Sequence, residues 1–169
     1  MTDIIHDTMQ NLEEAFAGES QAHNKYMAFA KKADEEGLPQ IARLFRAAAH
    51  AEHIHAQNHL RAMEGIKSTA ENLRAAIDGE NFEVVSMYPP FIEAAEAEGA
   101  RRAKTSLKWA WEVEKVHEAL YRQALASLDE TQEDYDYYVC PVCGHTHARN
   151  APEKCPVCGA PGSRFELIK

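Results

Sequence analysis

The hydrophobic and polar positions along the chain recur with helical spacing over most of its length. Residues 4–36 and 38–64 each place apolar side chains three and four positions apart among charged ones, as an amphipathic helix does. Gly37 separates the two segments, and Pro39 suits the first turn of the second helix. The pattern therefore predicts two long helices joined by a tight turn.

The second half of the chain predicts another pair of helices. Residues 66–78 are expected to form a connector with some helix from Thr69, followed by helices over about 79–98 and 101–128 with a turn at Gly99. Four long helices in two hairpins predict a bundle. The connector is longer than a simple up-down turn needs. It allows either a crossover within one chain or an exchange of hairpins between two chains.

The C-terminal end of the chain has a different character. Residues 131–137 lie in an acidic stretch without periodicity and are predicted to be a linker. Residues 138–169 hold all four Cys among short strand-like pieces. The sequence therefore predicts a mainly α protein, with a helical bundle over residues 1–130 and a small separate metal domain over residues 138–169.

An internal repeat relates the two predicted hairpins. Glu19 aligns with Glu80 at an offset of 61 residues, whereas the phrase Glu-x-x-His at 52–55 returns at 114–117 with an offset of 62. Tyr26 already aligns with Tyr88 at the longer offset of 62, so one extra residue lies between Glu80 and Tyr88. A helix usually absorbs a single inserted residue as a π-bulge, often at a functional site. The third helix is predicted to be irregular there.

Each copy of the repeat combines carboxylates with an imidazole. Residues three apart share a helix face, so Glu52 points with His55, and Glu114 points with His117. Burying such charges unpaired would cost on the order of several kcal/mol, whereas two divalent cations would compensate them. Oxygen and nitrogen ligands without sulfur suit iron or manganese, as in ferritin-like di-iron bundles. The alternative is solvated Glu and His on exposed helix faces.

Three further residues are candidates at this site. Glu83 follows Glu80 by three residues on the same face, and its repeat counterpart is Ala22. It is expected to be either a seventh ligand or a surface carboxylate. Tyr26 and Tyr88 match across the repeat, and each follows a candidate ligand by about two helical turns. They are expected either to hydrogen-bond the metal-binding carboxylates or to pack in the core.

The cysteines form two copies of a second motif. Cys140-Pro-Val-Cys143-Gly and Cys155-Pro-Val-Cys158-Gly each predict a tight knuckle whose backbone N–H groups bond to thiolate sulfur. Four thiolates in a tetrahedron suit iron or zinc, and the spacing does not choose between them. The N-terminus shows no basic region followed by an apolar run, so no secretory signal is expected. Metal rather than disulfides, in a reducing cytoplasm, is therefore predicted.

The charge balance narrows the range of partners. The chain has 27 Asp and Glu against 18 Lys and Arg, and its formal net charge is −9. Nucleic-acid binding needs clustered basic residues, so it is not expected. No stretch approaches the roughly 18 consecutive apolar residues of a membrane span. Neither nucleic acid nor a membrane is an expected partner.

Taken together, these motifs resemble the rubrerythrin family over almost the whole chain. Rubrerythrins are ferritin-like di-iron bundles fused to a rubredoxin-like Fe(Cys)4 domain. The resemblance implies two irons in the carboxylate site and one iron at the cysteines, where zinc is a possible substitute. It rests on the phrases Ala15-Phe16-Ala17-Gly18-Glu19-Ser20, Ala51-Glu52-x-x-His55, Gly79-Glu80-x-x-Glu83, Met87-Tyr88-Pro89 and Glu114-x-x-His117, together with the two cysteine knuckles.

The resemblance also assigns roles to individual residues. His55 would be a conditional ligand, exchanged with Glu83 as one iron moves on a redox change. Tyr26 and Tyr88 match tyrosines that surround the ligands in the family, so these four residues are the candidate catalytic residues. The implied di-iron ligands are Glu19, Glu52, Glu80, Glu83, Glu114 and His117.

The implied activity is reduction of hydrogen peroxide to water, in protection against oxidative stress. Rubredoxin or an NAD(P)H-dependent reductase would supply electrons through the Fe(Cys)4 centre. A tether of about nine flexible residues is not expected to bring that centre to its own di-iron site. The resemblance implies the family's solution, a head-to-tail homodimer, with hairpin exchange allowed. One alternative is a ferroxidase and iron-storage protein of ferritin type, which would need no electron-entry domain. Another is a non-enzymatic zinc-ribbon interaction protein.

Overall fold

The computed structural model describes residues 7–130 and 133–169. The chain divides into two compact units, Met1–Lys67 and Ser68–Lys169. The predicted start of the first helix at residue 4 and the first two positions of the predicted linker lie outside the described residues. Within the described ranges, no helix is both long enough and apolar enough to cross a membrane.

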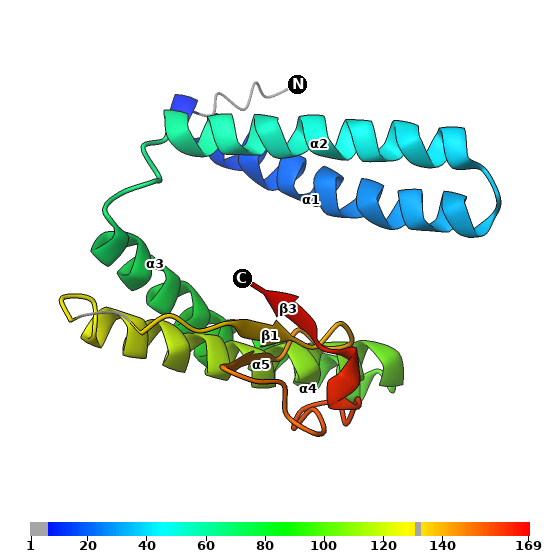
Figure 1. The fold of residues 1–169 in the computed structure, drawn as a ribbon. Coiled ribbons are helices and arrows are strands. Elements are labelled where there is room, and N and C mark those ends of the chain that lie inside the picture. Colours follow the sequence, from blue (N-terminus) through cyan, green and yellow to red (C-terminus); the bar gives the residue numbers. More distant parts are fainter. Residues whose placement is uncertain (1–6, 131–132) are drawn as a thin grey trace. The chain divides into compact units, whose positions relative to one another are not determined.

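The first unit is a hairpin of two long helices that run side by side in Figure 1. Helix α1 spans Thr8–Glu35 and helix α2 spans Pro39–Ala62. The Asp7 carboxylate accepts the backbone N–H of Gln10 at 2.9 Å and so caps the N-terminus of α1. Gly37 ends α1 in the left-handed region with φ of 74°, which confirms the predicted turn.

Alanines fill the contact between α1 and α2. The distance between two packed helices depends on the side chains at the contact, so small side chains bring the backbones close together. His23 adds a link between the helices, because its Nδ1 lies 2.9 Å from the carbonyl oxygen of Ala49. A larger side chain in this contact is expected to cost about 1–3 kcal/mol through overpacking. The buried alanines are Ala30, Ala33, Ala42, Ala49 and Ala56.

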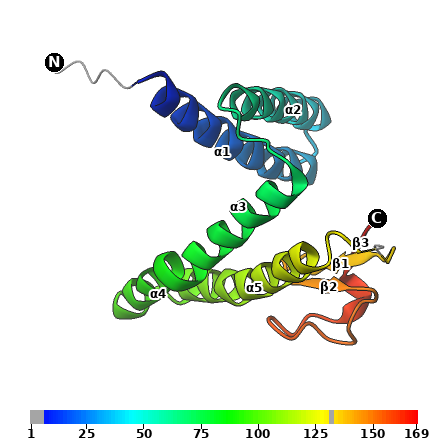
Figure 2. The same ribbon diagram turned by 90° about the vertical axis from the view of Figure 1, so that its left-hand side faces the viewer.

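The second unit begins with another hairpin, whose first arm is irregular. Helix α3 spans Thr69–Phe82, a π-helical turn covers Glu83–Met87, and helix α4 spans Tyr88–Ala97. Helix α5, Arg101–Ala126, packs against all three segments (Figure 2). Gly99 makes the predicted turn with φ of 67°. The core of this hairpin contains Ile77, Ile92, Ala95 and Val113.

The connector between the hairpins is shorter than the sequence pattern predicted. Ser68 and Glu71 form a capping box, in which the Ser68 N–H donates to the Glu71 carboxylate at 3.2 Å. This cap starts α3 at Thr69, so the prediction of helix from Thr69 is confirmed, whereas the predicted start near residue 79 is wrong. The remaining link contains only residues 63–68.

The extra residue in the repeat produces the predicted π-bulge. The backbone N–H of Tyr88 donates to the carbonyl oxygen of Glu83, five residues earlier, which is the π-helical pattern. Prolines in the first turn of α4 have no N–H groups to offer to the preceding turn. The indole N–H of Trp111 on α5 donates to the Val84 carbonyl at 2.8 Å. The bulge is therefore held by a side chain of the neighbouring helix.

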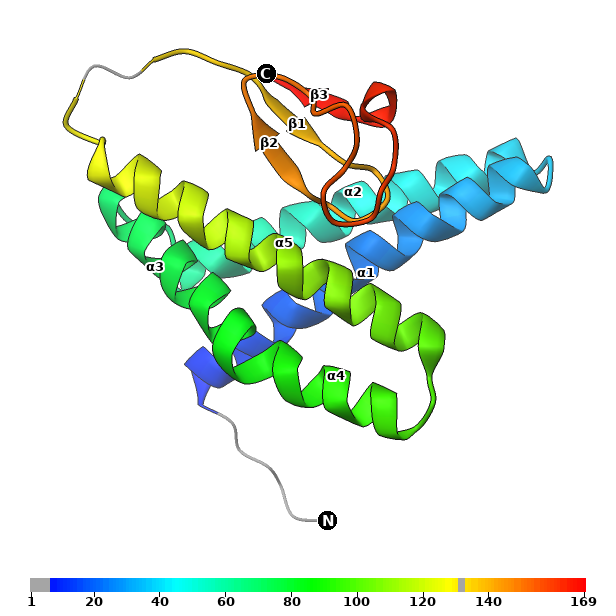
Figure 3. The ribbon, with the colours of Figure 1, turned by 90° about the horizontal axis from the view of Figure 1, so that it is seen from below.

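The C-terminal part of the second unit is a small antiparallel sheet with cysteine loops. Strands β1, Tyr137–Val139, β2, Thr146–Ala148, and β3, Glu166–Ile168, lie in the order β2-β1-β3. Figure 3 shows the sheet beside α5, and β2 makes the contact. Cys140 and Cys155 are buried at the centre of this domain. The short strand-like pieces predicted from the sequence are confirmed.

Candidate metal centre

The first ligand group lies in the α1–α2 hairpin. Glu52 and His55 share one face of α2, with 2.8 Å between the Glu52 Oε2 and the His55 Nδ1. Glu19 of α1 brings its Oε1 within 3.7 Å of the same nitrogen. One ligand atom from each of the three residues falls within 4.8 Å of the other two. The structure therefore brings together the three metal-ligand candidates from this half of the repeat.

The second ligand group repeats this geometry in the second unit. The Nδ1 of His117 on α5 lies 2.7 Å from the Glu114 Oε2. Glu80 of α3 places its Oε1 within 3.9 Å of the same nitrogen. The ligand atoms of these three residues also lie within 4.8 Å of one another. In both groups, Nδ1 is thus the nitrogen that faces the carboxylates.

The charges of the second group are poorly balanced without a cation. Burial raises the pKa of Glu80 to about 7, with a further contribution from Glu114 that His117 partly offsets. The hydrogen bond to Glu114 raises the pKa of His117. A divalent ion between these groups would relieve the repulsion between the carboxylates and accept the Nδ1 lone pair. The residues of this group therefore fit a bound metal.

Glu83 and Tyr88 lie close to the second group without belonging to its cluster of three. Burial and then the charge of Glu114 raise the pKa of Glu83, which is the first residue of the π-helical turn. Burial and then the charge of Glu83 raise the pKa of Tyr88. The charge of Glu114 therefore contributes to the raised pKa of both side chains. Their roles as ligand and as catalytic residue stay predictions.

Tyr26 is placed differently from its repeat partner Tyr88. Its ring packs at 6.3 Å from that of Phe29 and at 6.1 Å from that of Phe45, measured between centroids. Phe29 and Phe45 also meet each other edge to face at 5.5 Å. The described contacts of Tyr26 are thus aromatic packing in a half-exposed group, because Phe29 is 47% exposed, rather than packing in the buried core. A catalytic role for Tyr26 stays a prediction.

The four cysteines converge on one point in the C-terminal domain. All four are free thiols. The Sγ atoms of Cys140 and Cys158 are 3.6 Å apart, and those of Cys143 and Cys155 are 3.5 Å apart. Metal–sulfur bonds of about 2.3 Å in a tetrahedron place sulfurs about 3.8 Å apart. The cluster therefore fits a single metal ion and excludes the disulfide alternative in this structure.

Backbone N–H groups support the thiolates, as the knuckle motif predicted. Burial raises the pKa of Cys155, but hydrogen bonds from the N–H groups of Cys158 and Val157 outweigh it and bring this pKa down to about 7. The N–H of His145 likewise bonds to the Cys143 sulfur, although burial leaves the pKa of Cys143 raised. The backbone donors therefore favour the thiolate at Cys155, the form that ligates metals, whereas burial favours the thiol at Cys143 and Cys158 while no metal is bound.

The cysteine domain lies beside the second ligand group of its own chain. The Thr146 Oγ1 on β2 is 2.9 Å from the His117 Nε2 on α5. The expectation that the tether would keep this domain from its own ligand residues is therefore wrong for the second group. The reason is that β2 docks directly on α5, so the reach of the tether does not matter. Sequence reasoning missed Thr146, since no motif marks a contact made only in the folded chain.

His145, which lies two residues after Cys143 and belongs to no predicted site, has an unusual placement. Only 5% of its surface is exposed, and neither ring nitrogen has a hydrogen-bond partner among the described residues. Its ring meets those of His147 and Phe165 edge to face, at 6.0 and 6.3 Å between centroids. Burial lowers the pKa of His145, so the ring is held neutral.

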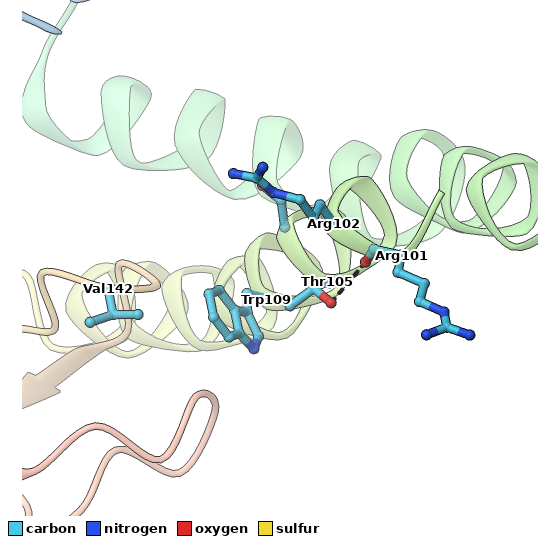
Figure 4. A pocket seen from close by; sticks show the side chains of 6 residues that line it. Arg101, Arg102, Thr105, Trp109 and Val142 are labelled. Carbon is cyan, nitrogen blue, oxygen red and sulfur yellow. Dashed lines mark hydrogen bonds between the residues drawn. The ribbon is translucent and has the colours of Figure 1, made fainter. Parts of the chain in front are cut away.

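Three cavities of the second unit border the cysteine domain, one of them between α5 and Val157. The one in Figure 4 has a volume of about 400 Å³ and extends from the first turns of α5, at Arg101 and Arg102, past Trp109 to Val142 between the cysteines. It contains none of the predicted site residues. The second, of about 310 Å³, is lined by both His117 and Thr146 and by mostly apolar neighbours. This cavity therefore reaches the edge of the second ligand group.

Comparison with known families matches nearly the whole chain. The sequence model of the rubrerythrin family matches residues 10–125, and that of the rubrerythrin rubredoxin-like domain matches residues 138–166. Together the two matches cover both ligand groups and all four cysteines.

Individual relatives agree with this result. Rubrerythrin-2 of Clostridium acetobutylicum is 34% identical, with 95% of this chain and 96% of the relative covered. Nigerythrin of Nitratidesulfovibrio vulgaris is 38% identical, with 95% and 86% covered. The solved structure of fully reduced, all-ferrous nigerythrin aligns with a TM-score of 0.58 and 36% identity over 99% of this chain and 89% of that one. The predicted mainly α, ferritin-like fold with a small rubredoxin-like domain is confirmed.

Proposed function

We propose that this chain, which belongs to the rubrerythrin family of di-iron proteins, is a peroxidase that reduces hydrogen peroxide to water. Its relatives support an oxidoreductase role, and the further step to peroxide is the proposal. The observation that carries it is the pair of Glu-x-x-His groups, which have the same Nδ1-to-carboxylate geometry in both hairpins. A ligand set repeated in this way suits two metal ions rather than one.

The proposed ligand set takes residues from both hairpins. Glu19 and Glu52 belong to the first group, and Glu80, Glu114 and His117 belong to the second. Iron bound by these residues would supply the two electrons of the reaction, H2O2 + 2 H⁺ + 2 e⁻ → 2 H2O. The negative charge of the ligand carboxylates would stabilise the additional positive charge of the iron after it has given up these electrons.

Glu83 and His55 are proposed to make the ligand set adaptable. Glu83 starts the π-helical turn, and its repeat counterpart is the non-ligating Ala22. It would replace His55 when the redox state changes. Tyr88 would donate a hydrogen bond to the carboxylates, because a phenol is protonated at neutral pH and burial raises the pKa of Tyr88 further. Tyr26 is proposed as its counterpart in the first hairpin, with its ring anchored by Phe45.

The cysteine domain is proposed to be the entry point for electrons. One iron at the four cysteines, with zinc as a substitute, would take electrons singly from rubredoxin or an NAD(P)H-dependent reductase. We propose a bundle over residues 1–130, a linker over 131–137 and an Fe(Cys)4 domain over 138–169. The resemblance to the family, rather than the reach of the tether, supports a head-to-tail homodimer in a reducing cytoplasm, with hairpin exchange allowed.

A coupled assay tests this function. The full-length protein, loaded anaerobically with Fe(II), is expected to contain three irons per chain and to consume NADH with peroxide when rubredoxin and its reductase are present. Cys143→Ser is the matched control, because it should stop turnover by rubredoxin while sparing a single oxidation of the carboxylate-bound iron by peroxide. Zinc as the only bound metal, or no peroxide consumption with three irons present, would rule the proposal out.

A further inference from the structure

We propose that the first hairpin carries a further metal site, at which His23 of α1 and His53 of α2 bind one divalent transition-metal ion such as Zn²⁺. The site is separate from both Glu-x-x-His groups and from the cysteines. Residues two positions apart on an α-helix point about 200° apart, so His53 points away from the ligand candidate His55. The proposal uses atoms of the first unit only and does not depend on the proposed peroxidase.

His23 is held in the way that metal-binding histidines are held. Its Nδ1 lies 2.9 Å from the carbonyl oxygen of Ala49 on α2. A carbonyl oxygen only accepts, so Nδ1 carries the proton, and in the neutral ring Nε2 keeps its lone pair. Metal-ligating histidines usually donate their other ring N–H to such an oxygen, which fixes the tautomer and the orientation of the ring. His23 is therefore prepared to bind a metal through Nε2.

The ring of His53 lies at the distance that a shared ion requires. The centroids of the His23 and His53 rings are 5.5 Å apart, and the ring planes are tilted by 47°. A Zn–N bond measures about 2.0–2.1 Å and the ring centre lies about 1.1 Å beyond the nitrogen, so two imidazoles on one tetrahedral ion have centroids about 5 Å apart. His53 is exposed, so an ion from solvent can reach it.

The two rings line a cavity of about 210 Å³ together with the polar side chains of Ser20, Asn24 and Gln57. The Ser20 hydroxyl donates to the Phe16 carbonyl at 2.6 Å, and the Asn24 amide donates to the Ser20 carbonyl at 2.9 Å. These hydrogens are thus used on the backbone of α1. The hydroxyl oxygen and the amide oxygen keep lone pairs that can accept or coordinate.

This set of donor atoms favours a cation of a particular kind. No Lys or Arg is among the described residues that line the cavity, and the whole chain has a formal net charge of −9. Unshared lone pairs without a neighbouring positive charge suit a cation rather than an anion. Imidazole ligands suit zinc, copper and nickel, whereas magnesium and calcium prefer oxygen ligands alone.

A zinc titration followed by NMR tests the proposal. The full-length chain is first loaded with three equivalents of zinc, which fill the carboxylate and cysteine sites, and further zinc is then added. We expect the ring signals of His23 and His53 to shift together along one saturation curve that ends at one additional zinc per chain. A curve in which neither ring or only one ring responds would overturn the proposal.

Three variants identify the ligands. His23→Asn keeps an N–H in the place of Nδ1 but removes Nε2, and His53→Gln removes the second imidazole. Each should weaken binding of the additional zinc at least about tenfold, because loss of a group that only supports a metal ligand already costs about 10- to 100-fold. His50→Gln is the matched control, since His50 is exposed on α2 and does not line the cavity. Wild-type affinity in either ligand variant, or equal weakening by His50→Gln, contradicts the proposal.

Magnesium separates a built site from general attraction of cations to an acidic chain. At the same concentration as the additional zinc, Mg²⁺ is expected to leave both rings unshifted, because it binds imidazole poorly. Equal shifts with Mg²⁺ would contradict the proposal. The readout is metal binding rather than turnover, so this site and the proposed peroxidase can fail separately.

Discussion

The two ligand groups have nearly the same internal geometry and different surroundings. Glu52 meets His55 at 2.8 Å, and Glu114 meets His117 at 2.7 Å. The His55 side chain is 53% exposed, whereas that of His117 is 27% exposed and has Thr146 on its other nitrogen. The repeat has thus preserved the ligand motif while the protein around it has diverged. Equal ligands do not imply equal roles.

The divergence has a local cause in the helix that carries Glu80. Helix α1 runs without a break through Glu19, but the corresponding arm of the second hairpin contains the π-helical turn that begins at Glu83. The extra residue widens the helix from Glu83 onward. Glu83 itself stands where the first hairpin has Ala22, and it adds a carboxylate near Glu114. The second hairpin is therefore the half in which we expect the metal ligands to change.

Removing Glu83 is the strongest way to make the two groups alike. Glu83→Ala installs the residue found at its repeat counterpart, Ala22. We expect the rate of oxidation by peroxide to fall about 10- to 100-fold, the range seen when a group that supports a metal site is lost. Single-turnover kinetics of the ferrous protein would measure it. Glu93→Ala, an exposed Glu on α4, is the control, and equal rates for all three proteins would contradict the role of Glu83.

The π-helical turn itself can be weakened through Trp111. Trp111→Phe keeps an aromatic ring but leaves the Val84 carbonyl without its 2.8 Å donor. An unsatisfied, partly buried carbonyl costs about 1–3 kcal/mol, so urea unfolding of the zinc-loaded chain should show a loss of that size. Trp109→Phe is the matched control on the same helix. If both variants lose the same stability, the bond to Val84 does not hold the turn.

The stability of the metal-free protein should depend on pH, because burial and neighbouring carboxylates disfavour the charged form of Glu80 in the second ligand group. The pKa of Glu80 is about 7 in the folded chain against an ordinary value of 4.5. Between those pH values the folded chain holds more protons than the unfolded chain, so stability falls as the pH rises from about 4.5 to about 7. His117 acts in the same direction, because its raised pKa stabilises the fold at low pH and that contribution disappears as the pH rises through the folded value.

Urea unfolding of the metal-free chain between pH 5 and pH 8 measures this effect. We expect a decrease on the order of 1 kcal/mol from Glu80, since partial solvent access screens these charges. Glu80→Gln should flatten the slope. Its repeat counterpart, Glu19→Gln, is the control, and equal flattening by the two changes would mean that the groups are not electrostatically different.

The sequence predicted those features of the fold that depend on a few neighbouring residues or on the number of residues between two motifs. The π-helical turn followed from one inserted residue before Tyr88, and the turns followed from Gly37 and Gly99. The start of α3 was misplaced because helical periodicity received more weight than the Ser-x-x-Glu cap at Ser68. A capping signal in four residues fixes a helix end better than a pattern averaged over many.

The candidate site was predictable in its residues but not in its environment. The spacing within each motif places Glu114 beside His117 wherever that helix lies. The contact between His117 and Thr146 depends on how β2 docks on α5, and no local pattern encodes it. The raised pKa of Glu80 likewise comes from burial and from neighbours on another helix. Such properties arise from tertiary packing, so sequence spacing alone does not contain them.

Stopped-flow oxidation of the all-ferrous, full-length protein tests the central claim most directly. Peroxide and dioxygen would be mixed with the protein at equal concentration, and the absorbance of the carboxylate-bound iron would be followed in time. The account predicts that peroxide oxidises this iron much faster than dioxygen does. Oxidation by dioxygen at an equal or greater rate would contradict it and would favour an iron-oxidising role for the two ligand groups.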